Sequence, residues 1–170
     1  MAPGTVQKFV EISGLAVGAA ALLGLGTTLT ARRRLLVVTV TGWSMYPTYR
    51  DGDRLLARRG GRLRRGATVV VEAPDVRTGW AGRRFGAAPG AARGQLVKRV
   101  VALPGDTVPE PFHQVLGAAT GDRVPRDRML ILGDAPASFD SKQAGYCPRE
   151  AVVGVVVCLL ARGPQAAPQH

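Results

Sequence analysis

Three short segments carry side chains suited to chemistry, and the first centres on a serine. Ser44 stands in the segment Gly42-Trp43-Ser44-Met45-Tyr46-Pro47-Thr48, directly after an aliphatic run. A serine hydroxyl is a poor nucleophile until a neighbouring base takes its proton. Where a strand gives way to a turn, the Ser44 hydroxyl would be exposed and its backbone N–H would face a developing oxyanion. Spacing alone favours a plain turn, so the serine needs a basic partner.

The second segment, Leu96-Val97-Lys98-Arg99-Val100-Val101, offers that base. Strand alternation puts Lys98 and Arg99 on opposite faces. Burial costs less free energy for lysine than for arginine, because an amine can lose its proton and a guanidinium effectively cannot. Burial lowers the pKa of a lysine toward the range of a general base. The alternative is an outward-facing lysine on an exposed strand face.

Composition supports an amine with a special role. The chain has 170 residues and 23 basic side chains, of which only Lys8, Lys98 and Lys142 are lysines. The net charge of +11 is spread along the chain rather than gathered in one stripe. We therefore expect no nucleic-acid partner, although such a charge is common in proteins that have one.

No other residue competes for the role of base. His113 lies in a proline-flanked loop and His170 is the last residue, so both are expected to be solvated. Cys147 and Cys158 fit no metal-ligand spacing and no redox motif, and they are consistent either with a disulfide or with two buried thiols. We expect neither a metal nor an organic cofactor.

The third segment runs from Gly133-Asp134 to Asp140-Ser141-Lys142. Asp140 and Lys142, two apart on an extended segment, are expected to share a side and pair. Taken alone, the segment is equally typical of a capped surface loop.

The elements that must position these residues are predicted to be mainly strands, because valine-rich runs alternate with Gly- and Pro-containing turns. The predicted strands are 35–40, 54–57, 67–72, 95–103, 129–132 and 151–160. They fall in one expected domain, residues 35–162. Residues 73–94 are predicted to form a flexible surface loop, and residues 163–170 a disordered tail.

An uncharged, apolar run over residues 12–30 precedes this domain. Its length is adequate for one transmembrane helix, so residues 1–34 are interpreted as a short tail and a single membrane anchor, with a cleaved signal peptide as the alternative. Arg32, Arg33 and Arg34 follow the run, and the positive-inside rule alone would keep the domain in the cytoplasm.

Together and in this order, the three segments resemble the type I signal peptidase family of serine–lysine peptidases. Residues 44–48 look like the family's nucleophile box, and Asp51-Gly52-Asp53 looks like the box that follows it. Residues 98–106 look like the box with the lysine base, and residues 133–142 look like the last box. The match spans residues 37–157.

The resemblance implies an all-β catalytic core behind one N-terminal transmembrane helix, on the extracytoplasmic side of the plasma membrane. It implies cleavage of preprotein signal peptides after small residues, usually Ala at the first and third positions before the scissile bond. No cofactor is implied. The family resemblance and the positive-inside rule predict opposite orientations, and we follow the family resemblance. We expect the protein to be a monomer in contact with the lipid bilayer.

Carried over residue by residue, the resemblance makes Ser44 the nucleophile, with its N–H as one oxyanion donor, and Lys98 the general base. It makes Ser138 the serine that orients the lysine, and Asp140 the carboxylate that supports the last box.

The chain departs from the family pattern at several positions. Gly42 stands where some members have a hydroxyl residue that binds the oxyanion. Ala135 replaces the usual asparagine and Lys142 the usual arginine, in a last box that is one residue short. The stretch between Gly105 and Arg128 leaves room for only a small accessory domain.

Three other functions fit parts of this pattern. A maturation protease dedicated to one substrate would explain the altered last box. An inactive anchored scaffold of the same fold would not need both Ser44 and Lys98. A self-cleaving cytoplasmic repressor shares the serine–lysine pair, but it would carry a DNA-binding domain where this chain has its apolar run.

Overall fold

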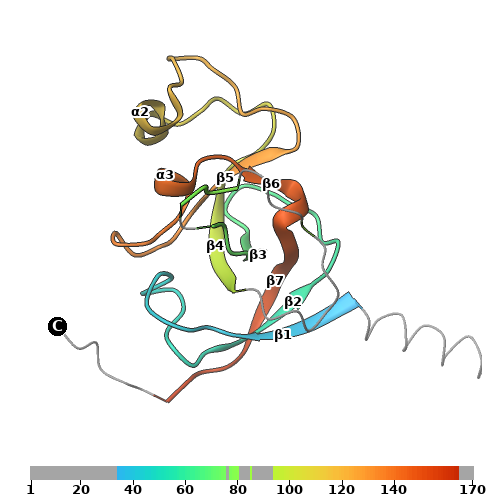
Figure 1. Cartoon of the computed structure of the whole chain (residues 1–170). Helices are drawn as coiled ribbons and strands as arrows, with labels where there is room; N and C mark the ends of the chain where they lie inside the picture. Colours follow the sequence, from blue (N-terminus) through green and yellow to red (C-terminus); the bar gives the residue numbers. More distant parts are fainter. Residues whose placement is uncertain (1–33, 76, 81–84, 86–93, 165–170) are drawn as a thin grey trace, which may run out of the picture. The chain divides into compact units, whose positions relative to one another are not determined.

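The computed structural model describes residues 34–75, 77–80, 85 and 94–164. Seven strands form one sheet in the order β1-β2-β7-β3-β4-β5-β6 (Figure 1). Their bounds are β1 Leu35–Thr39, β2 Arg54–Arg58, β3 Thr68–Glu72, β4 Gln95–Ala102, β5 Arg128–Leu132, β6 Cys147–Pro148 and β7 Val152–Ala161. The predicted mainly β core is therefore confirmed, and each of the six predicted strands is present within one residue at either end.

The centre of the sheet is built from valine. All five residues of β3 are buried, and β3 pairs antiparallel with β4 on one side and with β7 on the other. A strand covered on both faces reads as a continuous apolar run rather than an alternating one. The long-range pairing of β7 between β2 and β3 brings the end of the chain back to its middle.

Strand β4 changes partners along its length. Residues 95–99 pair with β3, whereas only residues 99–102 pair with β5. Among the described residues, no strand therefore pairs with the other edge of β4 over residues 95–98. A strand edge without a partner presents free N–H and C=O groups to an extended peptide.

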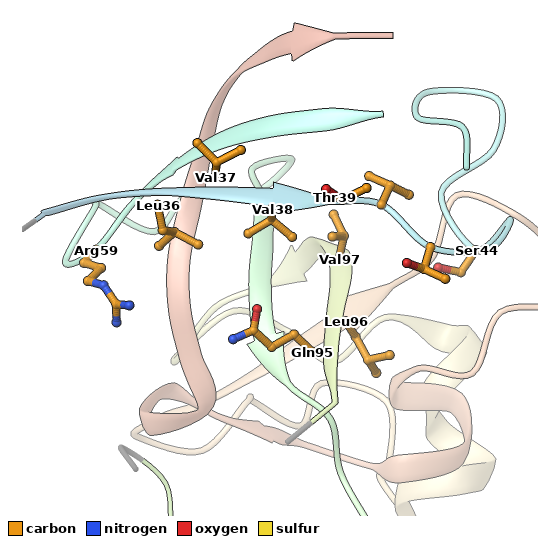
Figure 2. Close-up of a pocket in the computed structure, with 11 residues that line it drawn as sticks. Leu36, Val37, Val38, Thr39, Ser44, Arg59, Gln95, Leu96 and Val97 are labelled. Carbon is orange, nitrogen blue, oxygen red and sulfur yellow. The ribbon is translucent and has the colours of Figure 1, made fainter. Parts of the chain in front are cut away.

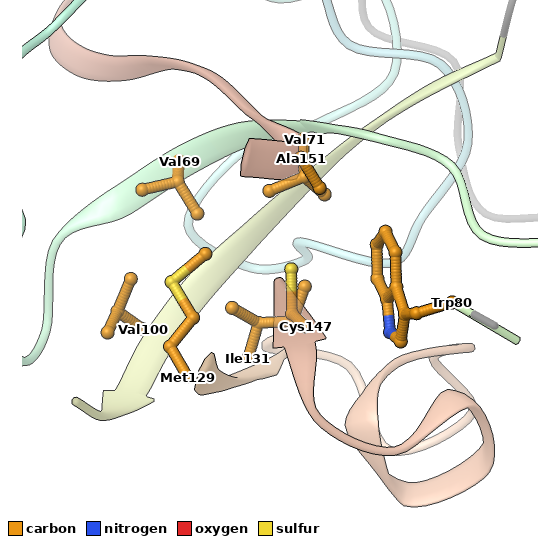
Figure 3. Packing of buried hydrophobic residues seen from close by; sticks show 8 residues of the cluster. All are labelled: Val69, Val71, Trp80, Val100, Met129, Ile131, Cys147 and Ala151. Atoms are coloured by element: carbon orange, nitrogen blue, oxygen red, sulfur yellow. The ribbon is translucent and has the colours of Figure 1, made fainter. Parts of the chain in front are cut away.

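The main core cluster is formed by side chains from β3, β4, β5 and β6, together with Ala151 and Trp80 (Figure 3). It contains Trp80, which is only 7% exposed, with Phe85 packed against the cluster. Both residues belong to the segment 73–94, which the sequence predicts to be a flexible surface loop. The described part of that segment is instead anchored to the interior by an aromatic side chain.

The connection between β4 and β5 packs against these two strands, through Ala102 of β4 and Leu130 of β5. It contains η1, Glu110–Phe112, and α2, His113–Leu116, and buries Phe112 with Val108 and Val124. The ring of His113 lies within hydrogen-bond distance of the Val108 carbonyl oxygen, at 2.9 Å. The expectation that His113 is simply solvated is therefore wrong, because this side chain helps to close the connection.

The chain after β7 is held by a buried carboxylate. Asp53 is 1% exposed and accepts hydrogen bonds from the Gly163 N–H at 2.9 Å and from the Arg162 guanidinium at 2.9 Å. Gly163, predicted as the start of a disordered tail, is thus fixed, whereas residues 165–170 lie outside the described part.

The expected anchor, residues 12–30, also lies outside the described residues. Among the residues that are described, no helix is long and apolar enough to cross a membrane. The two cysteines are free thiols, Cys147 buried and Cys158 exposed, so they do not form the disulfide that the sequence left open.

Candidate active site

Ser44 lies in a loop, residues 41–52, that is closed at its base by backbone hydrogen bonds. The Val40 N–H donates to Asp53 at 2.8 Å, and the Gly52 N–H donates to Val40 at 2.9 Å. Met45 is fully buried and holds the loop against the core. Ser44 beside it is half-buried, and its main-chain N–H donates no hydrogen bond within the described chain. The hydroxyl therefore reaches the surface on a fixed backbone, with an unused donor beside it.

Gly42 lies in the turn that precedes Ser44. Its φ of +81° lies in the region that glycine adopts without strain. Its N–H donates to Asp51 Oδ1 at 2.7 Å, so this donor is already used. Gly42 shapes the turn before Ser44 and supplies no side-chain donor of its own.

Lys98 is buried in β4, with 1% of its surface exposed. Its ammonium group donates to Ser138 Oγ at 2.6 Å. Burial lowers the pKa of Lys98 and the charge of Lys142 lowers it further, whereas the carboxylates of Asp140 and Asp134 oppose the shift. The prediction that strand alternation turns Lys98 inward is confirmed.

The backbone of Ser44 and the side chain of Ser138 both lie next to Gly133. The Ser44 carbonyl oxygen accepts a hydrogen bond from the Ala135 N–H at 3.1 Å. A Cβ atom on Gly133 would collide both with the Ser138 side chain, the partner of Lys98, and with the Ser44 carbonyl oxygen. The loop 41–52 and the segment 133–142 are thus in close contact.

No hydrogen bond joins Ser44 Oγ to Lys98 Nζ in the described chain. Ser138 is the residue that accepts the hydrogen bond of the lysine, and it is only 3% exposed, whereas Ser44 is half-buried. Hydrogen bonds between catalytic groups are often long or absent in unliganded sites and tighten when substrate binds.

Asp140 organises the last segment. It is 2% exposed, caps the short helix α3, Ser141–Ala144, and accepts hydrogen bonds from the N–H groups of Lys142 and Gly133, at 3.0 and 3.1 Å. Gln143 completes a capping box by accepting from the Asp140 N–H at 3.0 Å. The carboxylate therefore fixes the position of Gly133 beside the lysine.

The predicted pairing of Asp140 with Lys142 is observed, at 3.9 Å between Oδ2 and Nζ. The predicted geometry is wrong, because the two residues lie at the start of a helical turn rather than along an extended segment. The Lys142 side chain is one-third exposed and also donates to the Pro136 carbonyl oxygen at 3.4 Å.

Arg99 and Asp134 form an ion pair that the sequence did not predict. The Arg99 guanidinium binds Asp134 through two hydrogen bonds, at 2.8 and 2.6 Å. It also donates to the Gly66 carbonyl oxygen at 2.9 Å and to Thr48 Oγ1 at 3.4 Å. The hydrogen bond from Arg99 lowers the pKa of Asp134, and the same bond raises the pKa of Arg99. The Arg99 side chain thus links β4 to the loop 41–52 and to the segment 133–142.

A groove of about 520 Å³ leads to Ser44. One wall is β1 with the residues that follow it, and the other is the start of β4, Gln95 to Val97 (Figure 2). Ser44 and Arg59 lie toward opposite ends of β1 in this view. The β4 edge left without a strand belongs to this stretch, so the groove runs along free backbone groups as well as apolar side chains.

Comparison with known proteins assigns the family. The model described as "Signal peptidase, peptidase S26" matches residues 8–116, which include Ser44 and Lys98 but end before the segment 133–142. The chain is 28% identical over 152 residues to signal peptidase I V of Bacillus subtilis (strain 168), with 69% of this chain and 80% of that protein covered. It is 30% identical over 133 residues to signal peptidase I T of the same organism, with 68% of each covered. The chain belongs to the S26 signal peptidase family.

Proposed function

We propose that this protein is a membrane-anchored serine endopeptidase that removes N-terminal signal peptides from exported preproteins. The observation that carries the proposal is the buried Lys98 amine, with its lowered pKa, held by Ser138 beside the main chain of Ser44. Membership of the S26 family supports the same reaction.

In the proposed mechanism, neutral Lys98 takes the proton of the Ser44 hydroxyl as its oxygen attacks the scissile carbonyl carbon. The tetrahedral intermediate collapses to an acyl-enzyme on Ser44, and the Lys98 ammonium returns its proton to the leaving amine. A water molecule then attacks the ester carbon while Lys98 takes its proton, and the acid product leaves as Lys98 returns that proton to Ser44 Oγ. This cycle follows the general logic of a nucleophile activated by an adjacent base.

The surrounding residues would divide the remaining tasks. Ser138 holds the lysine nitrogen in place, and the free Ser44 N–H is positioned to donate to the oxyanion. Gly42 adds no side-chain donor, which leaves the oxyanion site with one contributor fewer than in enzymes that use such a hydroxyl. Asp140 and the Arg99–Asp134 pair act as positioning groups, because they hold the loops rather than touch the substrate.

Substrate recognition is proposed to occur in the groove. An extended peptide between β1 and the free edge of β4 would form backbone hydrogen bonds in the manner of an added strand. Cleavage after small residues, of the Ala-X-Ala type, is the specificity that the family resemblance implies. The apolar walls close to Ser44 favour small, uncharged side chains at the positions that enter them.

The proposed location is the plasma membrane, with the apolar run 12–30 as a single-pass anchor and the catalytic domain outside. The length of that run and the family both support an anchor. Protease accessibility of the C-terminal residues in intact cells tests this orientation. Degradation of the tail from outside is expected, and protection of the tail would contradict it.

A second candidate is a maturation protease that serves one substrate. The altered last box, with Ala135 and Lys142, is the observation that favours it. A panel of unrelated preproteins separates the two functions, because a general signal peptidase cleaves most of them and a dedicated enzyme cleaves one.

The proposal is tested with the purified full chain and an Ala-X-Ala reporter. We expect Ser44→Ala and Lys98→Arg each to abolish cleavage, since arginine cannot act as a neutral base. Arg54→Lys, at an exposed position of β2, is the control and is expected to be active. Normal turnover by Lys98→Arg would overturn the assignment of the base, and an inactive wild-type chain would favour the scaffold.

A further inference from the structure

A second cavity, of about 380 Å³, is lined by residues outside the groove. Its apolar lining includes Leu63, Leu103 and Met129, and its polar lining consists of three arginines, Arg62, Arg128 and Arg149. The lining contains no carboxylate.

The described part of the chain places no compensating anion beside the three guanidinium groups. Among the described residues, no carboxylate forms an ion pair with any of them. Asp127 and Glu150 are their neighbours in sequence, but neither lines the cavity. All three arginines are exposed, and an anion among them would be attracted to each of the three charges.

The backbone that carries two of these arginines is fixed. Arg128 opens β5 and pairs with Pro148 of β6, and the Arg149 N–H donates to the Asp127 carbonyl oxygen at 2.8 Å. The third, Arg62, comes from the connection between β2 and β3. The three charges therefore come from three separate segments of the chain that the fold brings to one cavity, and not from a run of adjacent arginines.

We propose that this cavity, defined by Arg62, Arg128 and Arg149, binds a phosphate-type anion. Planar guanidinium groups bind phosphate oxygens in pairs, with a geometry that matches both partners. The apolar lining next to the arginines suits the first carbons attached to such a group. Two sources share this chemistry, the head group of an anionic phospholipid and a soluble phosphate.

The cavity is distinct from the proposed catalytic groove. No residue lines both the groove and the cavity. The cavity includes neither Ser44 nor Lys98. Binding at the cavity is therefore independent of whether Ser44 and Lys98 act as proposed.

The test uses the full chain in neutral detergent and isothermal titration calorimetry with inorganic phosphate as the first probe. The pocket variant combines Arg62→Gln, Arg128→Gln and Arg149→Gln. A control with the same change in charge combines Arg54→Gln, Arg58→Gln and Arg126→Gln, at exposed positions that do not line the cavity. We expect saturable binding by the wild type and the control, and at least tenfold weaker binding by the pocket variant.

The second arm compares dihexanoyl phosphatidylglycerol with dihexanoyl phosphatidylcholine below their critical micelle concentrations. Binding of the glycerol lipid at least tenfold tighter than inorganic phosphate assigns the lipid head group as the ligand. Equal binding of that lipid and inorganic phosphate assigns a soluble phosphate.

Three results would overturn the proposal. They are the absence of saturable binding to any probe, equal weakening of the pocket and control variants, and equal affinity for the anionic and the zwitterionic lipid. Circular dichroism of both variants verifies that they remain folded.

Discussion

Replacement of Gly133 by alanine is the sharpest perturbation that this geometry offers. Gly133 lies between the Ser44 carbonyl oxygen and the Ser138 side chain, and Ser138 holds the Lys98 amine. The Gly133 N–H also donates to Asp140 at 3.1 Å, so the backbone is restrained from the other side. One added methyl group would therefore act on both proposed catalytic residues at once.

The size of the effect follows from the contacts. A Cβ atom at residue 133 would lie 2.5 Å from the Ser44 carbonyl oxygen. Non-bonded heavy atoms prefer about 3.5 Å, so the two segments must move apart by about 1 Å. A misplacement of about 1 Å costs on the order of 100-fold in rate. Overpacking of a buried site also costs about 1–3 kcal/mol of unfolding free energy.

The assay measures kcat/KM on an Ala-X-Ala reporter together with urea denaturation of the same samples. We expect Gly133→Ala to lose about 100-fold in kcat/KM while it still unfolds cooperatively. Gly94→Ala is the matched control, because among the described residues its Cβ would meet only the Ala73 methyl, at 3.5 Å, an ordinary contact. If Gly133→Ala is folded and cleaves within about threefold of the wild type, well short of the loss that such a misplacement causes, the contact between the two segments is irrelevant to the reaction.

Two further predictions concern charge. Lys142→Gln removes a cation that pairs with Asp140 and lowers the pKa of Lys98. We therefore expect the pKa of Lys98 to rise in this variant and the acidic limb of its kcat/KM profile to move to higher pH. An acidic limb that stays at the wild-type pH would contradict the coupling between Lys142 and Lys98. Arg162→Gln leaves the buried Asp53 carboxylate without its guanidinium partner and is expected to lower the unfolding free energy by about 1–2 kcal/mol at neutral pH in urea titrations. Burial raises the pKa of Asp53, but hydrogen bonds from the Arg50 and Gly163 N–H groups and from Arg162 hold it below its ordinary value. This contribution is therefore present above about pH 4 and is lost as the pH falls through the folded pKa, so a destabilisation that persists unchanged in acid would refute the linkage.

The strands could be predicted because they depend on local sequence. Valine-rich runs between Gly and Pro turns mark β3, β4 and β7 without reference to the rest of the chain. Their order in the sheet could not be predicted, since β7 inserts between β2 and β3 through pairings between distant residues. The burial of Trp80, within the expected surface loop, could not be predicted for the same reason: it depends on contacts with residues distant in the sequence.

Some features of the candidate active site could be predicted from the sequence and others could not. Alternation along a strand predicted an inward Lys98, whereas the role of Ser138 came from the family resemblance. The Arg99–Asp134 pair joins residues 35 apart in sequence, and charge pattern alone gives no partner over that distance. The helix α3 is too short to show a helical period, but Asp140 and Gln143 have the spacing of a capping box, and this signal was available.

The central claim is that Ser44, and not the serine that contacts Lys98 directly, forms the covalent intermediate. A peptide ester substrate, acid quenching in the steady state and peptide mapping by mass spectrometry locate the acyl group. We expect the added mass on the peptide that contains Ser44 and its absence in Ser44→Ala, because Ser138 is buried at 3% exposure and cannot reach the groove. An acyl group on Ser138, or turnover by Ser44→Ala at the wild-type rate, would contradict the account.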